Sequence, residues 1–194
     1  MEITLKTEDE KLIFTFDSTR WSLVKAYDTL KDVNAFSDSK VDFIGVLDEN
    51  KVFLIEVKNL RNRPPNASDG IIKKLQVDED SKYDSKNQPI IKEMLDCVKD
   101  SLLFMTLHQR YETVESDLWI KLQSFLTNKE VKIVIILCLE MDNEYLPKID
   151  SQKLKVIRNT IEKRLKAVFS RITDQVLLID SQSNSPFFKI KYQT

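Results

Sequence analysis

Hydrophobic positions near the amino terminus follow two different periods. Residues 3–6 and 11–17 surround an acidic turn and predict two short strands. Asp17 or Ser18 is then suited to cap a helix. The expected helix has one buried face, made by Leu23, Val24, Tyr27 and Leu30 at helical spacing.

The clearest pattern in the chain is a β-hairpin formed by residues 41–47 and 52–57. Both runs are rich in β-branched and aromatic side chains, and the polar residues 48–51 join them. The second run is apolar on both of its faces until Glu56, which is typical of a strand inside a covered sheet.

The remaining residues predict a long connection followed by alternating helices and strands. Residues 60–89 are rich in proline and charge, which indicates a flexible loop or insertion. Helices are expected over 90–111, 116–126 and 151–172, and strands over 131–140, 176–180 and, as an edge strand, 187–192. This order predicts a single domain over residues 1–194, of the α/β class, with a mixed sheet flanked by helices on both faces.

The composition narrows the class of protein. With 42% hydrophobic and 31% charged residues the chain has an ordinary globular balance, and its net charge of −1 means that any nucleic-acid affinity must come from local patches. The first residues are too polar for a signal peptide, and the longest apolar run, residues 133–139, is too short to cross a membrane. We therefore expect a cytoplasmic protein in which Cys97 and Cys138 are reduced, buried thiols.

Several kinds of site have little support in the sequence. His108 is the only histidine and has polar neighbours, so we expect it at a helix end on the surface rather than in a catalytic triad or a zinc site. Two glycines are too few for a glycine-rich phosphate loop. The aromatic side chains expected in the core, rather than as platforms for stacked bases, are Phe14, Phe16, Phe104, Trp119 and Phe169.

Three residues are charged where the pattern predicts burial. Glu56 and Lys58 end an apolar run and lie two apart on one strand, so both point to the same face. Asp42 opens the partner strand. A three-residue loop would place it opposite Glu56, whereas a two-residue loop would place it opposite Val57 and on the other face, unless a bulge intervenes. A solvated strand end with a weak ion pair is the alternative interpretation.

In the first register, two carboxylates and one ammonium converge at one end of the hairpin. Hard oxygen ligands suit Mg²⁺ or Mn²⁺, which keep several waters and accept a phosphate oxygen. Such an ion lowers the pKa of a bound water and offsets charge on the attacked phosphate. A neighbouring lysine can hold the attacking water. The trio therefore predicts metal-assisted hydrolysis of a phosphodiester.

The stretch 41–45 followed by 53–59 resembles the signature of the PD-(D/E)XK, or restriction-endonuclease-like, nuclease superfamily. In that signature an Asp precedes a (D/E)-x-K motif by a short hairpin, and here thirteen residues separate Asp42 from Glu56. One departure is Val41, which stands where the family often has proline. The order of the expected helices and strands is compatible with a restriction-endonuclease-like core.

The resemblance implies a role for each residue of the motif. Asp42 and Glu56 would bind Mg²⁺, or Mn²⁺, with the Val57 carbonyl as a third ligand and Lys58 as the catalytic lysine. The implied activity is hydrolysis of DNA, with RNA as a further possible substrate. A homodimer or a larger protein assembly is compatible with this activity. The alternative is a nuclease-like binding or regulatory module that has lost cleavage, because a fold alone does not give a function.

Residues outside the motif have more general expected roles. Many family members carry an acid on the helix before the hairpin, for which Asp28 is the best match, and a polar residue on the helix after it, for which Lys99 or Gln109 is suited. The basic residues expected to contact a nucleic-acid backbone are Arg61, Arg63, Lys73, Lys74 and Lys99. Helix 151–172 carries seven basic residues against Glu162 alone, which fits either a phosphate-binding face or a solvated one.

Overall fold

A computed structural model of the protein describes residues 1–7, 10–61, 89–108, 114–141 and 151–193. Its strands are β1 (Glu2–Lys6), β2 (Leu12–Asp17), β3 (Trp21–Ala26), β4 (Phe43–Leu47), β5 (Lys51–Asn59), β6 (Lys132–Glu140), β7 (Gln175–Ile179) and β8 (Lys189–Tyr192). Its helices are the 3-10 helix η1 (Tyr27–Thr29), α1 (Lys31–Phe36), α3 (Pro89–Leu107), α4 (Ser116–Thr127) and α5 (Ser151–Phe169). Most of the predicted 60–89 segment lies outside the described residues.

The strands form two sheets, and the larger one is mixed, as the sequence predicts. Five strands follow the order β3-β4-β5-β6-β7, and three others form an antiparallel sheet in the order β1-β2-β8. Strand β4 is antiparallel to both β3 and β5, whereas β5, β6 and β7 run parallel to one another. Parallel neighbours need a crossover connection. Helices α3 and α4 lie in the connection between β5 and β6, and α5 lies between β6 and β7.

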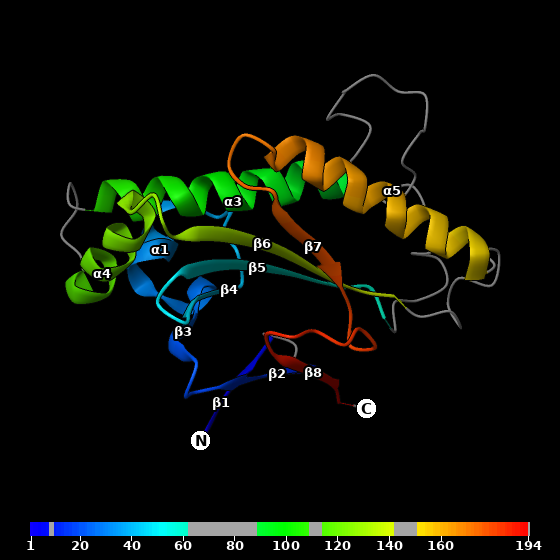
Figure 1. The fold of residues 1–194 in the computed structure, drawn as a ribbon, viewed down its shortest axis with the longest axis horizontal. Coiled ribbons are helices and arrows are strands. Elements are labelled where there is room, and N and C mark those ends of the chain that lie inside the picture. The colour runs from blue at the N-terminus through cyan, green and yellow to red at the C-terminus, as the bar shows by residue number, and fades with distance from the viewer. Residues whose placement is uncertain (8–9, 62–88, 109–113, 142–150, 194) are drawn as a thin grey trace.

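The described helices lie on one face of the larger sheet, and the small sheet covers the other (Figure 1). Alternation along the central strands builds both layers. Leu54 and Ile135 belong to a cluster shared with the helices, whereas Phe53 and Ile136 belong to a cluster shared with β2. For the part of the chain that the structure describes, the prediction of helices on both faces is therefore wrong. The reason is that β1, β2 and β8 form an antiparallel sheet with one apolar face. This face packs against the larger sheet, where helices were expected.

The helix expected after Asp17 or Ser18 is also wrong, because the chain there forms strand β3. This strand pairs antiparallel with β4, and a β-bulge interrupts the register between Trp21 and Leu23. The bulge precedes Leu23, and the pairing is regular from Leu23 to Ala26. Leu23 and Val24 pack on opposite faces of this strand, while Tyr27 lies in η1 and Leu30 precedes α1. Apolar residues from different elements therefore recur at a spacing that resembles a helix. Gly45 on β4 permits this pairing, since a Cβ atom there would lie 2.6 Å from a ring carbon of Trp21.

His108 lies in the interior instead of on the surface. Its side chain is 2% exposed, and its Nδ1 is 3.0 Å from the Met105 carbonyl oxygen. Its ring lies near that of Trp119, which projects from α4 and is completely buried. The polar neighbours of His108 in the sequence predicted an exposed side chain. Its burial results from helix packing, which the local sequence does not reveal. The five aromatic residues predicted to belong to the core are all buried.

Both thiols are free and buried, as predicted, but they lie on opposite faces of the large sheet. Cys97 belongs to the cluster that contains the helices, and Cys138 to the cluster that contains the small sheet. None of the helices in the described part of the chain is both long enough and apolar enough to span a membrane.

Candidate active site

The register of the β4–β5 hairpin decides whether Asp42 and Glu56 meet. Leu47 pairs with Lys51, so the loop consists of residues 48–50, and its first two residues adopt left-handed φ angles of 49° and 53°. This is the three-residue loop that the site requires. Extending the register by one position beyond the end of β4 places Asp42 opposite Glu56.

The charged trio faces the helices. Glu56 and Lys58 share the parity of the buried Leu54, which packs in the helix-facing cluster. Glu56 is 3% exposed, and its Oε1 lies 2.9 Å from the Lys58 Nζ. The Lys58 side chain keeps 28% of its surface exposed. A buried carboxylate and a partly accessible ammonium therefore sit side by side at the end of β5.

Asp42 is held between the two strands of the hairpin. The Val57 backbone N–H donates to Asp42 Oδ2 at 2.5 Å, and the Tyr27 N–H donates to the Asp42 carbonyl oxygen at 2.7 Å. Burial raises the pKa of the Asp42 carboxyl, and the neighbouring Glu56 charge raises it further. The hydrogen bond from Val57 only partly offsets these effects. The carboxyl groups of Asp42 and Glu56 are therefore close together and shielded from water, so their negative charges repel each other.

The Glu56 carboxyl is also perturbed by its buried position. Burial raises the pKa of its carboxyl, and the charge of Lys58 opposes that rise. Among the residues that the structure describes, nothing donates a hydrogen bond to Glu56 Oε2, although this oxygen is buried. A buried oxygen without a partner is costly. A cation placed against Glu56 and Asp42 would satisfy that oxygen and relieve the repulsion between the carboxylates, so the two residues fit a divalent metal.

The donor set is small. No group of three or more His, Cys, Asp or Glu side chains with the spacing of a metal site occurs in the described ranges. A hard ion such as Mg²⁺ nevertheless binds through one or two carboxylates and retains several waters. The pair formed by Asp42 and Glu56 is therefore compatible with Mg²⁺ or Mn²⁺. Water molecules would have to supply the other ligands of the ion.

Two further ligands implied by the family resemblance can be placed. Asp28 lies in the 3-10 helix η1 rather than in an α-helix, yet its charge still raises the pKa of Asp42, which brings it to the same site. The Val57 side chain packs with the cluster on the opposite face, while its N–H binds Asp42. The role of the Val57 carbonyl as a ligand stays a prediction.

Two site residues come from α3 and were not singled out in the sequence. Glu93 Oε2 lies 3.5 Å from the Lys58 Nζ, so Lys58 contacts two carboxylates. The buried Cys97 thiol lies close to the Glu56 carboxylate, and burial, with the charge of Glu56, raises the pKa of this thiol to about 12. Their spacing of four residues on an otherwise apolar helix face was the only available signal, and it does not reveal which strand the helix covers.

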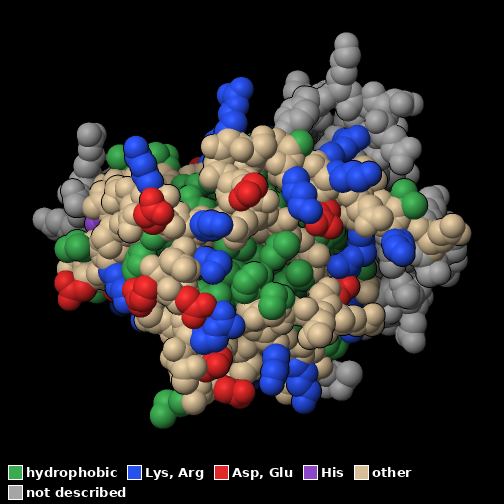
Figure 2. Space-filling view, in the orientation of Figure 1, with side chains coloured by type: hydrophobic (Ala, Val, Ile, Leu, Met, Phe, Trp, Pro, Cys, Tyr) green, Lys and Arg blue, Asp and Glu red, His purple; other side chains and the backbone are tan. Residues whose placement is uncertain are grey.

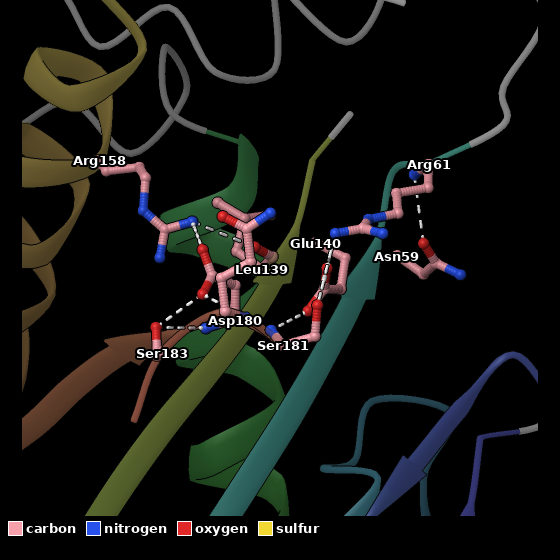
Figure 3. A network of polar contacts seen from close by, with 9 residues as sticks. Asn59, Arg61, Leu139, Glu140, Arg158, Asp180, Ser181 and Ser183 are labelled. Carbon is pink, nitrogen blue, oxygen red and sulfur yellow. Dashed lines mark hydrogen bonds and ion pairs between the residues drawn. The ribbon is translucent and has the colours of Figure 1, made fainter. Parts of the chain in front are cut away.

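Arg61 takes part in a different network, at the ends of β5, β6 and β7 (Figure 3). Its guanidinium lies 3.0 Å from Glu140 Oε2 and 4.5 Å from the centre of the Tyr192 ring. Glu140 is completely buried and also accepts hydrogen bonds from the Ser181 N–H and hydroxyl. The structure thus gives Arg61 a structural partner, which a nucleic-acid phosphate would have to displace.

The other expected nucleic-acid contacts are only partly described. Lys99 is exposed on α3, whereas Arg63, Lys73, Lys74 and Gln109 lie outside the described residues.

Lys and Arg side chains are spread over the face that carries α5, with acidic side chains among them (Figure 2). On this helix Arg158 binds Asp180 at 2.7 Å and Lys166 binds Glu162 at 2.6 Å, while Lys163 is exposed. Part of the basic face is therefore neutralised, and both interpretations of this helix stay open.

Comparisons of the chain with protein-family models, with curated proteins and with solved structures found no match.

Proposed function

We propose that the protein is a metal-dependent nuclease of the PD-(D/E)XK type that hydrolyses phosphodiester bonds, with DNA as the expected substrate. The observation that supports this most strongly is Glu56, which lies opposite Asp42 and beside Lys58. It is a buried carboxylate, and one of its oxygens has no hydrogen-bond partner among the described residues. A plain strand end would leave these charges in water. Here Glu56 is buried beside Asp42, and a divalent cation would stabilise both carboxylates in this environment.

Each residue of the site would have its own part in the reaction. Asp42 and Glu56 would hold Mg²⁺ or Mn²⁺, and Asp28 lies close enough to add negative charge to the site. The metal would supply Lewis acidity toward the phosphate and its water ligands. Lys58 would orient the attacking water and stabilise charge on the phosphate, because its ammonium is partly accessible while anchored to Glu56.

Cleavage of supercoiled plasmid and of single-stranded RNA, with Mg²⁺, Mn²⁺ or chelator, tests this proposal. We expect metal-dependent cleavage by the wild type and its loss in Glu56→Gln and Lys58→Gln. The matched controls are Glu130→Gln and Lys132→Gln, which change the same charges at exposed positions at the opposite end of β6. Cleavage that persists in Glu56→Gln would contradict the proposal.

Absence of cleavage would favour a different function. If no substrate is cut with either metal while the wild type and variants are equally folded, a nuclease-like binding module becomes the better account. Retention of labelled DNA by the wild type, measured in the same samples, would then support that account.

A further inference from the structure

Helix α3 covers the candidate site from the side opposite the hairpin. Its residues Glu93 and Cys97 are four apart, so they lie on the same helix face, and this face is turned toward β5. On β5, Glu56 and Lys58 are two apart and share one face of the strand. The two elements thus present two side chains each, and each helix residue contacts one strand residue.

The first contact joins Cys97 to Glu56. The thiol is 9% exposed and lies one helical turn from Glu93, on the α3 face that meets Lys58 and Glu56. The two groups are close enough for the thiol and the Glu56 carboxylate to shift each other's pKa. A buried carboxylate with few donors can rotate. A donor on the facing helix fixes its plane, and the free Oε2 then has a defined direction.

The second contact joins Glu93 to Lys58. The ammonium lies 2.9 Å from Glu56 and 3.5 Å from Glu93, and the Glu93 side chain is 42% exposed. If Glu56 binds a cation, its attraction for Lys58 is weakened, because the metal takes up its charge. Glu93 then becomes the remaining anionic anchor of Lys58 at the site.

We propose that α3 supplies the second wall of the active site, with Cys97 positioning the metal-binding carboxylate Glu56 and Glu93 positioning Lys58. This inference rests on the proposed function, because it assigns these residues a part in the same reaction. Neither residue touches the reacting atoms. Their effects must therefore appear separately, in metal binding for Cys97 and in turnover for Glu93.

The role of Cys97 is tested by the affinity for Mn²⁺, measured from the electron paramagnetic resonance signal of the free ion. We expect Cys97→Ala to bind Mn²⁺ about tenfold more weakly than the wild type. We expect Cys97→Ser to bind nearly as well, since a hydroxyl also donates. Cys138→Ala is the matched control, because it empties a buried thiol site on the opposite face of the same sheet.

Equal Mn²⁺ affinity in the wild type and Cys97→Ala, or an equal loss in Cys138→Ala, would overturn the role of Cys97. Absence of Mn²⁺ binding by the wild type itself would instead refute the metal site on which the proposed function depends. The two failures are therefore distinguishable.

The role of Glu93 is tested by steady-state cleavage. We expect Glu93→Gln to lower kcat by about tenfold with KM and Mn²⁺ affinity unchanged. Asp96→Asn removes the same charge three residues further along α3 and should leave kcat unaltered. A wild-type kcat in Glu93→Gln, or an equal loss in Asp96→Asn, would overturn this role.

Discussion

Replacing Asp42 with asparagine is expected to stabilise the metal-free protein while removing its response to metal. The Asp42 carboxyl is buried beside Glu56, and its pKa is raised from 3.8 to about 8. An acid whose pKa is raised by folding favours the folded state below its unfolded pKa, and this stabilisation is lost as pH rises toward the folded pKa. At neutral pH the wild type therefore bears a cost that asparagine avoids. The amide still accepts the hydrogen bond from Val57 and can donate one to Glu56.

The size of the effect follows from the pH interval. Between pH 3.8 and pH 7 the cost grows by about 1.4 kcal/mol for each pH unit, which gives a ceiling of about 4 kcal/mol at pH 7 and about 2 kcal/mol at pH 5. Sharing of a proton between Asp42 and Glu56 relieves part of this cost. We therefore expect Asp42→Asn to be more stable than the wild type by about 2 kcal/mol at pH 7 in chelator.

Urea denaturation of both proteins at pH 4, 5, 6 and 7 measures this difference. The advantage of Asp42→Asn should shrink as pH falls and disappear near pH 4. Adding Mg²⁺ should stabilise the wild type alone, because a ligand that binds only the folded state raises its stability. A variant that is equally or less stable than the wild type at pH 7 in chelator, or a stability difference that does not change with pH, would show that the buried Asp42 carboxylate does not destabilise the folded protein.

Two other features of the fold and one buried ion pair give stability predictions that the same denaturation assay can check. Glu140→Gln should cost about 3–5 kcal/mol, because it leaves the largely buried Arg61 without its charged partner; a loss under 1 kcal/mol would contradict this. Gly45→Ala should cost about 1–3 kcal/mol, since the added methyl group meets the Trp21 ring; an unchanged urea midpoint would show that the ring can move. Asp32→Ala should cost about 1–3 kcal/mol, because this carboxylate accepts hydrogen bonds from two backbone N–H groups and an indole N–H; a urea midpoint equal to that of the wild type would argue against these contacts.

The hairpin and its charged trio were predictable because their signals are local. Alternation, the polar turn and the apolar run before Glu56 all lie within residues 41–58, and the choice of register reduced to the length of one loop. The strands β6 and β7 and the helices α3, α4 and α5 were likewise predictable from apolar periodicity, to within a few residues.

The layers of the fold and the helix side of the site were not predictable, because they depend on packing between distant segments. Apolar residues of β3, of η1 and of the position before α1 together looked like one helix. The apolar face of β2 does not reveal that it covers the larger sheet, a place expected to hold helices. Glu93 and Cys97 likewise became site residues only through the docking of α3 on β5.

The most direct test of the central claim is a crystal structure of the protein soaked with Mn²⁺, with anomalous diffraction used to locate the ion. We expect an anomalous peak in contact with the carboxylates of Asp42 and Glu56, within reach of Lys58, and its loss in crystals of Glu56→Gln. An ordered Mn²⁺ bound only elsewhere, or no peak at Asp42 and Glu56 at saturating Mn²⁺, would contradict it.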